Sequence, residues 1–215
     1  MTPLVPDERL VPDERRWNHN LHYHPLIVGA VPAGCTRALD VGCGEGTLTR
    51  RLRVVVPDVT GIDLHVESIA LARSHPSAGD IEYLVGDVLS YPLEPGSFDM
   101  VTVVASLHHM DAPLALARFR DLLAPGGVLA VIGLARSSLP ADIPIEVAAA
   151  IAHRLHRSRK GLWQQPSPTV WPPPETYRGM RSVAERVLPG ARYRRHLLWR
   201  YSLVWTKPPE ATPPD

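Results

Sequence analysis

Residues 38–47 read ALDVGCGEGT, an apolar run that leads into a turn containing three glycines. Residues 37–41 have the length and apolar character of a buried strand, and Leu48 and Leu52 have the spacing of one face of a helix over 47–53. Glycines allow the backbone to turn sharply and let a ligand approach main-chain atoms that a Cβ would shield. The stretch therefore predicts a strand, a ligand-binding turn and a helix in direct succession.

The same alternation of periods continues along the chain. We expect further strands at 58–63, 81–85, 97–105 and 128–134, and helices at 66–74 and 113–123. Strands that alternate with helices of about ten residues favour right-handed crossovers and a parallel sheet covered on both faces. The predicted fold class is a doubly wound α/β domain.

The regular alternation of predicted strands and helices ends after residue 135. A longer amphipathic helix is expected at 143–159, a proline-rich loop at 163–174 and another helix at 175–187. Residues 191–196 and 198–206 resemble two strands close enough to pair antiparallel.

The two ends of the chain differ in composition from its middle. The hexapeptide LVPDER occupies residues 4–9 and again 10–15, and the chain is proline-rich from residue 208. We expect a proline-rich tail over 1–16, a single domain over 17–207 and a loose tail over 208–215. Within the domain, residues 17–32 are expected to form a lid, and residues 136–174 an insertion.

Composition excludes several classes of protein. The 215 residues are 45% hydrophobic and 21% charged, as in ordinary globular domains. The first residues lack the basic and apolar regions of a secretory signal, and the longest apolar run, 128–135, falls far short of the roughly 18 residues of a membrane span. Two cysteines cannot build a disulfide framework or a four-ligand zinc site. We expect a cytoplasmic protein without a membrane span, a monomer or a homodimer.

Charge is distributed unevenly. Residues 1–135 contain 10 Lys and Arg against 16 Asp and Glu, whereas residues 136–215 contain 13 against 6. The basic part fits either an anionic partner or a solvated arginine-rich surface. Because no RNA-binding module or lysine-rich tract is visible, we expect no nucleic-acid partner.

The spacing of the glycines separates two kinds of nucleotide ligand. A dinucleotide site has the pattern G-x-G-x-x-G, whereas Gly42, Gly44 and Gly46 give G-x-G-x-G with Glu45 inside the turn. A carboxylate there would repel a pyrophosphate, and Asp40 adds negative charge nearby. The turn therefore favours a nucleoside that carries a cationic amino-acid tail.

Two further acids follow predicted strands. Asp63 ends the second strand, where nucleoside-binding α/β folds place a carboxylate for the ribose hydroxyls, although an acid there can also cap a helix. Gly86, Asp87 and Val88 follow the third strand, where Asp87 either accepts from an adenine amino group or serves as a turn residue. Leu64 and Val88 are expected to enclose the ring.

At this point the chain resembles a known family. ALDVGCGEGTLTRRL, GIDLHVESIALAR, GDVLSYPLEPGSFDMVTVVASLHHM and LLAPGGVLAVIGL are similar to the successive motifs of class I S-adenosylmethionine-dependent methyltransferases of type 11. Within them, the chain resembles the branch that includes the ubiquinone and menaquinone biosynthesis methyltransferases. The resemblance covers residues 36–135. It implies a Rossmann-like seven-stranded sheet in the order 3-2-1-4-5-7-6, with the seventh strand antiparallel and helices on both faces.

The resemblance also implies S-adenosylmethionine as the cofactor and S-adenosylhomocysteine as its product. It places Asp40, Gly42 and Gly44 at the methionine part, Asp63 at the ribose, Asp87 and Val88 at the adenine, and Ala105 at the mouth of the site. Cys43 and Gly86 are included with these cofactor-binding residues. His22 and Tyr23 are expected to fold over the cofactor from the lid.

Methyl transfer from a sulfonium is an in-line displacement, so the protein mainly aligns the reactants and excludes water. A base is needed only where the acceptor loses a proton, and the candidates are His108, His109 and His24. Both neighbouring histidines, 108 and 109, can instead simply shape the pocket wall.

We expect methyl transfer to an oxygen, nitrogen or carbon of a small molecule, with secondary metabolites and quinone-like compounds among the candidates. The alternatives are a nicotinamide-dependent oxidoreductase and a non-catalytic S-adenosylmethionine-binding module.

Overall fold

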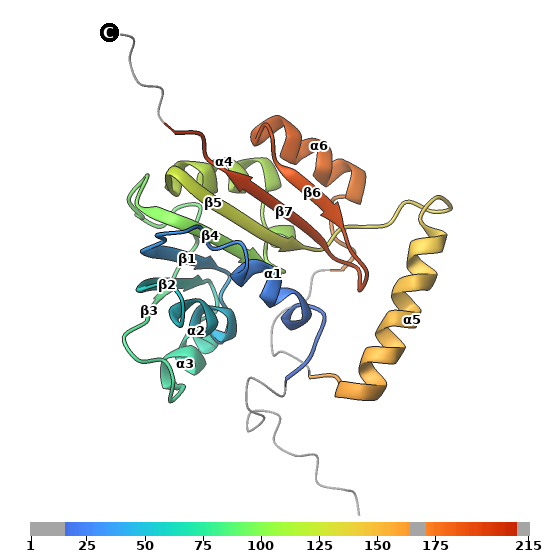
Figure 1. Cartoon of the computed structure of the whole chain (residues 1–215), viewed down its shortest axis with the longest axis horizontal. Coiled ribbons are helices and arrows are strands. Elements are labelled where there is room, and N and C mark those ends of the chain that lie inside the picture. Colours follow the sequence, from blue (N-terminus) through green and yellow to red (C-terminus); the bar gives the residue numbers. More distant parts are fainter. Residues whose placement is uncertain (1–15, 164–170, 210–215) are drawn as a thin grey trace, which may run out of the picture.

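The computed structural model describes residues 16–163 and 171–209, so the LVPDER repeats and parts of the proline-rich loop and both expected tails lie outside the described residues. Its centre is a seven-stranded sheet in the order β3-β2-β1-β4-β5-β7-β6 (Figure 1). The strands are β1 (Arg37–Val41), β2 (Asp58–Asp63), β3 (Glu82–Val85), β4 (Phe98–Val104), β5 (Leu123–Gly133), β6 (Arg192–Arg195) and β7 (Tyr201–Thr206).

Strands β1 to β5 run parallel, and β7 pairs antiparallel with both β5 and β6. The expected Rossmann-like sheet, its strand order and its antiparallel seventh strand are therefore confirmed. Several boundaries differ from expectation by one to three residues, and the start of β5 differs by more. β5 begins at Leu123 rather than at Val128, because Leu123 already pairs with Phe98 before a register shift interrupts the ladder.

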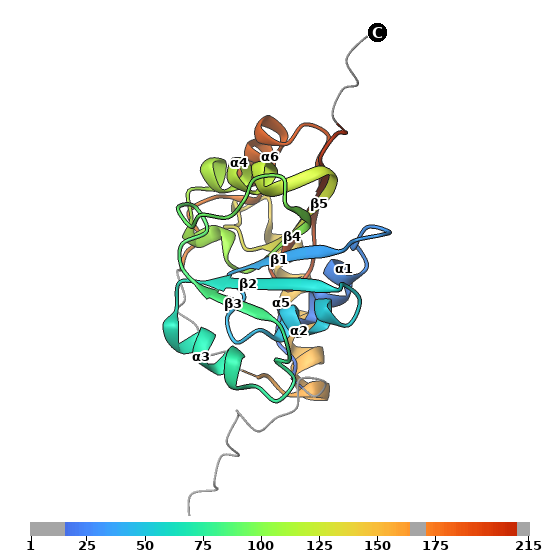
Figure 2. The same ribbon diagram turned by 90° about the vertical axis from the view of Figure 1, so that its left-hand side faces the viewer.

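Helices cover both faces of the sheet (Figures 1 and 2). The helices are α1 (His24–Val28), α2 (Thr47–Arg53), α3 (Val66–Ser74), α4 (Ala112–Leu122), α5 (Ile143–Lys160) and α6 (Tyr177–Val187), with short 3-10 turns at Leu21–Tyr23 and Leu107–His109. Helices α4 and α6 pack in the larger apolar cluster, whereas α1 and α2 belong to the cluster on the opposite face. None of the described helices is long and apolar enough to cross a membrane.

Helix α5 stands beside the sheet and packs along the chain that leads into α1 (Figure 1). The ring of His156 stacks on Trp17 with centroids 5.3 Å apart, and His19 Nε2 lies 2.8 Å from His153 Nδ1. The backbone N–H of Trp163 donates to the carbonyl oxygen of Trp17 over 2.8 Å. These contacts join the expected insertion to the N-terminal segment.

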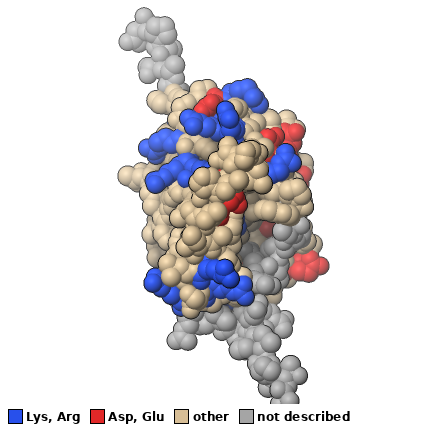
Figure 3. All heavy atoms as spheres, turned by 90° about the vertical axis from the view of Figure 1, so that its right-hand side faces the viewer, with Lys and Arg blue, Asp and Glu red and all other residues tan. Residues whose placement is uncertain are grey.

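The face toward which α5 lies carries two groups of basic side chains. Lys and Arg gather at its upper and lower ends, with mostly uncharged surface between them (Figure 3). On this face, the basic side chains are thus divided between separate patches.

Asp40 is a buried acid within the sheet, only 1% exposed. Its two carboxylate oxygens accept hydrogen bonds from the hydroxyls of Thr102 (3.0 Å) and Thr49 (2.7 Å). The three residues tie together β1, β4 and α2, the elements that flank the glycine turn. Burial nevertheless raises the pKa of Asp40 to about 6, because removal from water disfavours the charged form more than the two hydroxyls favour it.

We predict a pH dependence of stability from Asp40. Since its folded-state pKa lies above that of the unfolded chain, the native protein holds the extra proton, and stability falls as the pH rises from about 4 to about 6. A shift of two pKa units corresponds to about 3 kcal/mol. The free energy of unfolding, measured with urea between about pH 4 and pH 6, should therefore fall less in Asp40→Asn than in the wild type, by about 3 kcal/mol.

The threonine hydroxyls can accept as well as donate, so they can accommodate the amide. Asp58→Asn, on the exposed start of β2, is the matched control, and its stability should fall with pH as much as that of the wild type. Parallel stability profiles for the wild type and Asp40→Asn would contradict the assignment.

Candidate active site

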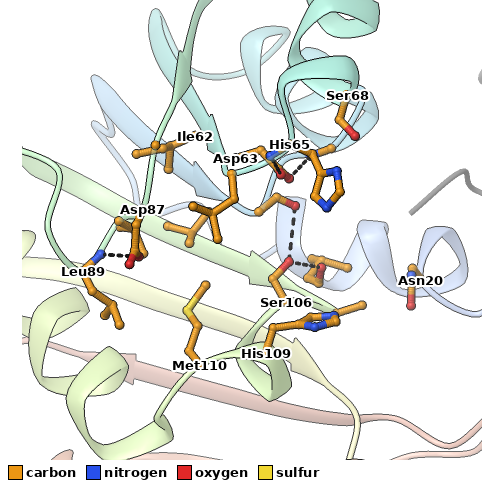
Figure 4. A pocket seen from close by; sticks show the side chains of 18 of the residues that line it. Asn20, Ile62, Asp63, His65, Ser68, Asp87, Leu89, Ser106, His109 and Met110 are labelled. Atoms are coloured by element: carbon orange, nitrogen blue, oxygen red, sulfur yellow. Dashed lines mark hydrogen bonds between the residues drawn. The ribbon is translucent and has the colours of Figure 1, made fainter. Parts of the chain in front are cut away.

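A cavity of about 390 Å³ opens at the carboxyl ends of the parallel strands (Figure 4). This is the edge at which open α/β sheets bind ligands. Nine of the residues expected from sequence line it: Gly42, Gly44, Asp63, Leu64, Gly86, Asp87, Val88, Ala105 and His109.

The glycine turn at the bottom of the cavity is fixed to the end of β2. The N–H groups of Gly42 and Cys43 both donate to the carbonyl oxygen of Ile62, over 2.8 and 3.2 Å. The N–H of Gly44 donates to Asp63 Oδ2 over 2.8 Å. Gly42 has a φ of +66°, and a Cβ there would collide with Ser106 at the end of β4, so the turn requires glycine at this point.

Asp63 also organises the chain that follows β2. Its second carboxylate oxygen accepts from the N–H of His65 over 2.8 Å. Each carboxylate oxygen has a second lone pair, so these two hydrogen bonds leave Asp63 able to accept from a ligand in the cavity that it lines. The acid therefore combines a structural role with a binding capacity.

The position of Asp87 is compatible with both roles considered from sequence, that of an adenine acceptor and that of a turn residue. Its Oδ1 accepts from the N–H of Leu89 over 3.0 Å, which is the geometry of a turn residue, and its side chain also borders the cavity (Figure 4). Val88 is buried, whereas Leu64 on the neighbouring strand end is exposed.

The cavity is electronegative. Its lining includes three aspartates, Asp63, Asp87 and Asp111, but no Lys or Arg among the described residues. Glu45, by contrast, does not line it and forms an ion pair with Arg16 over 2.7 Å. The expectation that Glu45 would set the local charge is therefore wrong, because Arg16 neutralises it, and three aspartates supply the negative charge instead.

Some of the expected residues lie below the turn rather than in the main cavity. Asp40, Cys43 and His24 line a smaller hollow of about 30 Å³ that shares Asn20, Gly42 and Val104 with the main cavity. Within the described residues, no three His, Cys, Asp or Glu side chains are grouped to hold a metal ion.

His22 and Tyr23 line neither cavity. The Tyr23 hydroxyl donates to the carbonyl oxygen of Leu197 over 2.5 Å, and His22 packs edge-on against His156 with ring centroids 4.8 Å apart. Both side chains thus join the N-terminal segment to the rest of the fold.

The two neighbouring histidines occupy different environments. His109 borders the main cavity, whereas His108 does not. Burial, with a smaller contribution from the charge of His109, lowers the pKa of His108 to about 4. Burial also lowers the pKa of His109, although the charge of Asp63 opposes this effect. His109 is therefore mostly neutral at pH 7 and in contact with the cavity.

Sequence reasoning missed Asn20 and Ser106. Ser106 donates toward the carbonyl oxygens of Gly42 and Val104, and it was recognisable only as the second residue after a strand. Asn20 lies two positions before His22, and its Oδ1 accepts from Arg200, 180 residues later. No local pattern indicates such a contact.

Comparison with known proteins agrees with this geometry. Residues 39–131 match the model of the methyltransferase domain family. An uncharacterized methyltransferase of Mycobacterium tuberculosis is 37% identical over 199 residues, which cover 91% of this chain and 99% of that protein. A ubiquinone biosynthesis O-methyltransferase of Xanthomonas campestris is 41% identical over 118 residues, covering 53% of this chain and 48% of that protein.

Solved structures share the fold. A protein of Pyrococcus horikoshii gives a TM-score of 0.62 at 18% identity, covering 86% of this chain and 87% of that one. Phosphoethanolamine N-methyltransferase 2 of Haemonchus contortus, in complex with S-adenosyl-L-methionine, gives 0.60 at 17% identity, covering 89% and 53%. With the full-length relative, the matching domain and the strand order in agreement, the chain belongs to the class I S-adenosylmethionine-dependent methyltransferases.

Proposed function

We propose that the main cavity holds S-adenosylmethionine with its adenine beside Asp87 and Val88, its ribose at Asp63 and its amino-acid tail over Gly42 and Gly44. The single observation that carries this proposal is the charge of the lining, three carboxylates with no lysine or arginine among the described residues, which suits a sulfonium and an ammonium group. The hydrogen bonds that Asp63 can still accept suit a ribose diol. Cys43 and Asp40 support the turn from beneath.

When bound, the cofactor supplies a methyl group already activated on a sulfonium. The residues of the chain have to orient the two reactants and exclude water, which can contribute several kcal/mol through positioning alone. We propose that the segment 17–32 and the described residues of the insertion 136–174 cover the acceptor side as parts of one domain over 17–207. Their mutual contacts through Trp17 and His156 support this arrangement.

We propose a small-molecule acceptor that is methylated on oxygen, nitrogen or carbon, with secondary metabolites and quinone-like compounds as the first classes to test. The partial likeness to a ubiquinone biosynthesis O-methyltransferase supports the quinone-like class. Where the acceptor loses a proton, His109 is the candidate base, because it borders the cavity and its lowered pKa leaves it neutral at pH 7. The positions of His108 and His24 outside the main cavity favour supporting roles for these two residues.

The cofactor site is tested by calorimetry with S-adenosylhomocysteine. We expect Asp63→Ala to weaken binding by about 10- to 100-fold or more, because it removes a charged acceptor for the ligand and also the acceptor that holds the N–H of Gly44. Asp58→Ala, at the exposed beginning of the same strand, should bind as the wild type does.

Unchanged affinity in Asp63→Ala would contradict the proposed ribose position. If the wild type instead bound NADH and gave no heat with S-adenosylhomocysteine, the cavity would belong to an oxidoreductase. Cofactor binding without turnover across broad acceptor panels would indicate a non-catalytic module.

The proposed base is tested by comparing two adjacent substitutions. With an acceptor that loses a proton on methylation, His109→Gln should lower kcat by about 10²- to 10⁴-fold, which is the usual contribution of general base catalysis. His108→Gln should change kcat little. Because the His109 pKa is lowered, kcat/KM of the wild type should fall only below about pH 6.5, as the ring becomes protonated. Equal losses in the two variants would contradict a base role for His109.

A further inference from the structure

Arg200, immediately before β7, is a buried cation that has no carboxylate partner among the described residues. Its side chain donates only to neutral oxygens. Nε and Nη2 reach Asn20 Oδ1 over 3.0 and 2.7 Å, and Nη1 reaches the carbonyl oxygens of Leu198 and Trp199 over 3.3 and 3.1 Å. Burial lowers the pKa of Arg200 to about 10, so the group is still charged at neutral pH. Burying a charge costs free energy, which is offset here by hydrogen bonds to neutral oxygens rather than by a counter-ion.

The contact with Arg200 fixes the orientation of the Asn20 amide. A guanidinium has only donors, so the atom facing it must be the amide oxygen, and the two N–H donors of Nδ2 are directed elsewhere. The backbone around Asn20 is also fixed, because Asn18 Oδ1 accepts from the N–H groups of Asn20 and Leu21 over 2.9 and 2.8 Å. Asn20 borders both the main cavity and the smaller hollow below the turn (Figure 4).

The turn itself has few donors left for an anion. The N–H groups of Gly42, Cys43 and Gly44 all donate to the end of β2. Three aspartates elsewhere in the lining repel a negatively charged group, and the Ser106 hydroxyl already donates toward the carbonyl oxygens of Gly42 and Val104. The amide of Asn20, polarised by the cation behind it, is the donor best placed to receive one.

We propose that Asn20 binds the α-carboxylate of the cofactor's amino-acid tail and that Arg200 is the positioning residue that aims and polarises its amide. This inference rests on the proposed cofactor site. It assigns to the N-terminal segment the recognition of the anionic end of a ligand whose other groups are cationic or neutral.

The test distinguishes recognition of the carboxylate from recognition of the rest of the ligand. Binding of S-adenosylhomocysteine and of its decarboxylated analogue, which lacks only the carboxylate, is measured by calorimetry on the wild type and on Asn20→Asp. The aspartate retains an acceptor for Arg200, so the unfolding temperature should not fall, but it replaces two N–H donors by a negative charge. We expect at least tenfold weaker binding of S-adenosylhomocysteine and unchanged or tighter binding of the analogue.

Equal losses for the two ligands, or an unchanged affinity for S-adenosylhomocysteine, would overturn the proposal. A wild type that bound neither ligand would refute the proposed cofactor site and this inference with it. A wild type that bound both, together with an Asn20→Asp variant that did not discriminate between them, would overturn the inference alone.

The role of Arg200 is tested by Arg200→Lys and Arg200→Gln. Neither side chain can hold Asn20 Oδ1 with two parallel N–H groups as the guanidinium does, so both should lower the affinity for S-adenosylhomocysteine more than that for the analogue. With a proton-losing acceptor, KM for the cofactor should rise while kcat changes little.

Arg195→Gln is the matched control. Arg195 lies in the same hairpin and pairs with Asp142 and Glu146, away from both cavities. It should not alter the ratio of the two affinities. The Asn20→Asp measurement decides the proposal even where an Arg200 variant does not fold.

Discussion

The carboxylate of Asp63 holds the turn after β1 against the end of β2, and the shape of the cavity depends on that contact. One oxygen receives the N–H of Gly44 and the other that of His65, so a single side chain fixes the backbone on two sides of the opening. The carbonyl oxygen of Ile62 adds two more hydrogen bonds to the same turn. A turn with a positive φ at Gly42 has no repeating ladder to maintain it, and these few bonds supply what a helix or sheet would otherwise provide.

Charge then determines which ligands this framework can accept. The Glu45 carboxylate is neutralised by Arg16, so it contributes little to the field inside the cavity, whereas Asp63, Asp87 and Asp111 face it. Three carboxylates in a partly buried opening disfavour a pyrophosphate more strongly than one acid within the turn would. The amino-acid tail of the proposed ligand has charges of both signs, and an electronegative lining favours its ammonium group and the neighbouring sulfonium over its carboxylate. Its carboxylate requires a separate source of positive potential.

The sequence contained enough information for the sheet and for the residues at its carboxyl edge. Strand and helix periods are local properties, and a residue that follows a parallel strand must lie at that edge, which is why Asp63, Asp87 and Ala105 could be placed before any coordinates. The directions of the side chains in a short irregular segment cannot be predicted in this way. His108 and His109 share a 3-10 turn, in which neighbouring side chains point about 120° apart, so only one of them reaches the cavity. Asn20, which precedes the 3-10 turn at Leu21–Tyr23, borders the cavity, whereas His22 and Tyr23 do not.

Contacts that join distant segments were beyond local patterns altogether, and they are the ones that hold the N-terminal segment in place. Arg16 ties it to the glycine turn, Asn20 ties it to Arg200 beside β7, and Trp17 ties it to α5. These polar and aromatic contacts add to the apolar cluster in which Trp17, Tyr23 and Ile27 are buried. Residues 16–20 therefore connect the glycine turn, the edge of the main cavity, the residue before β7 and helix α5 through side-chain contacts.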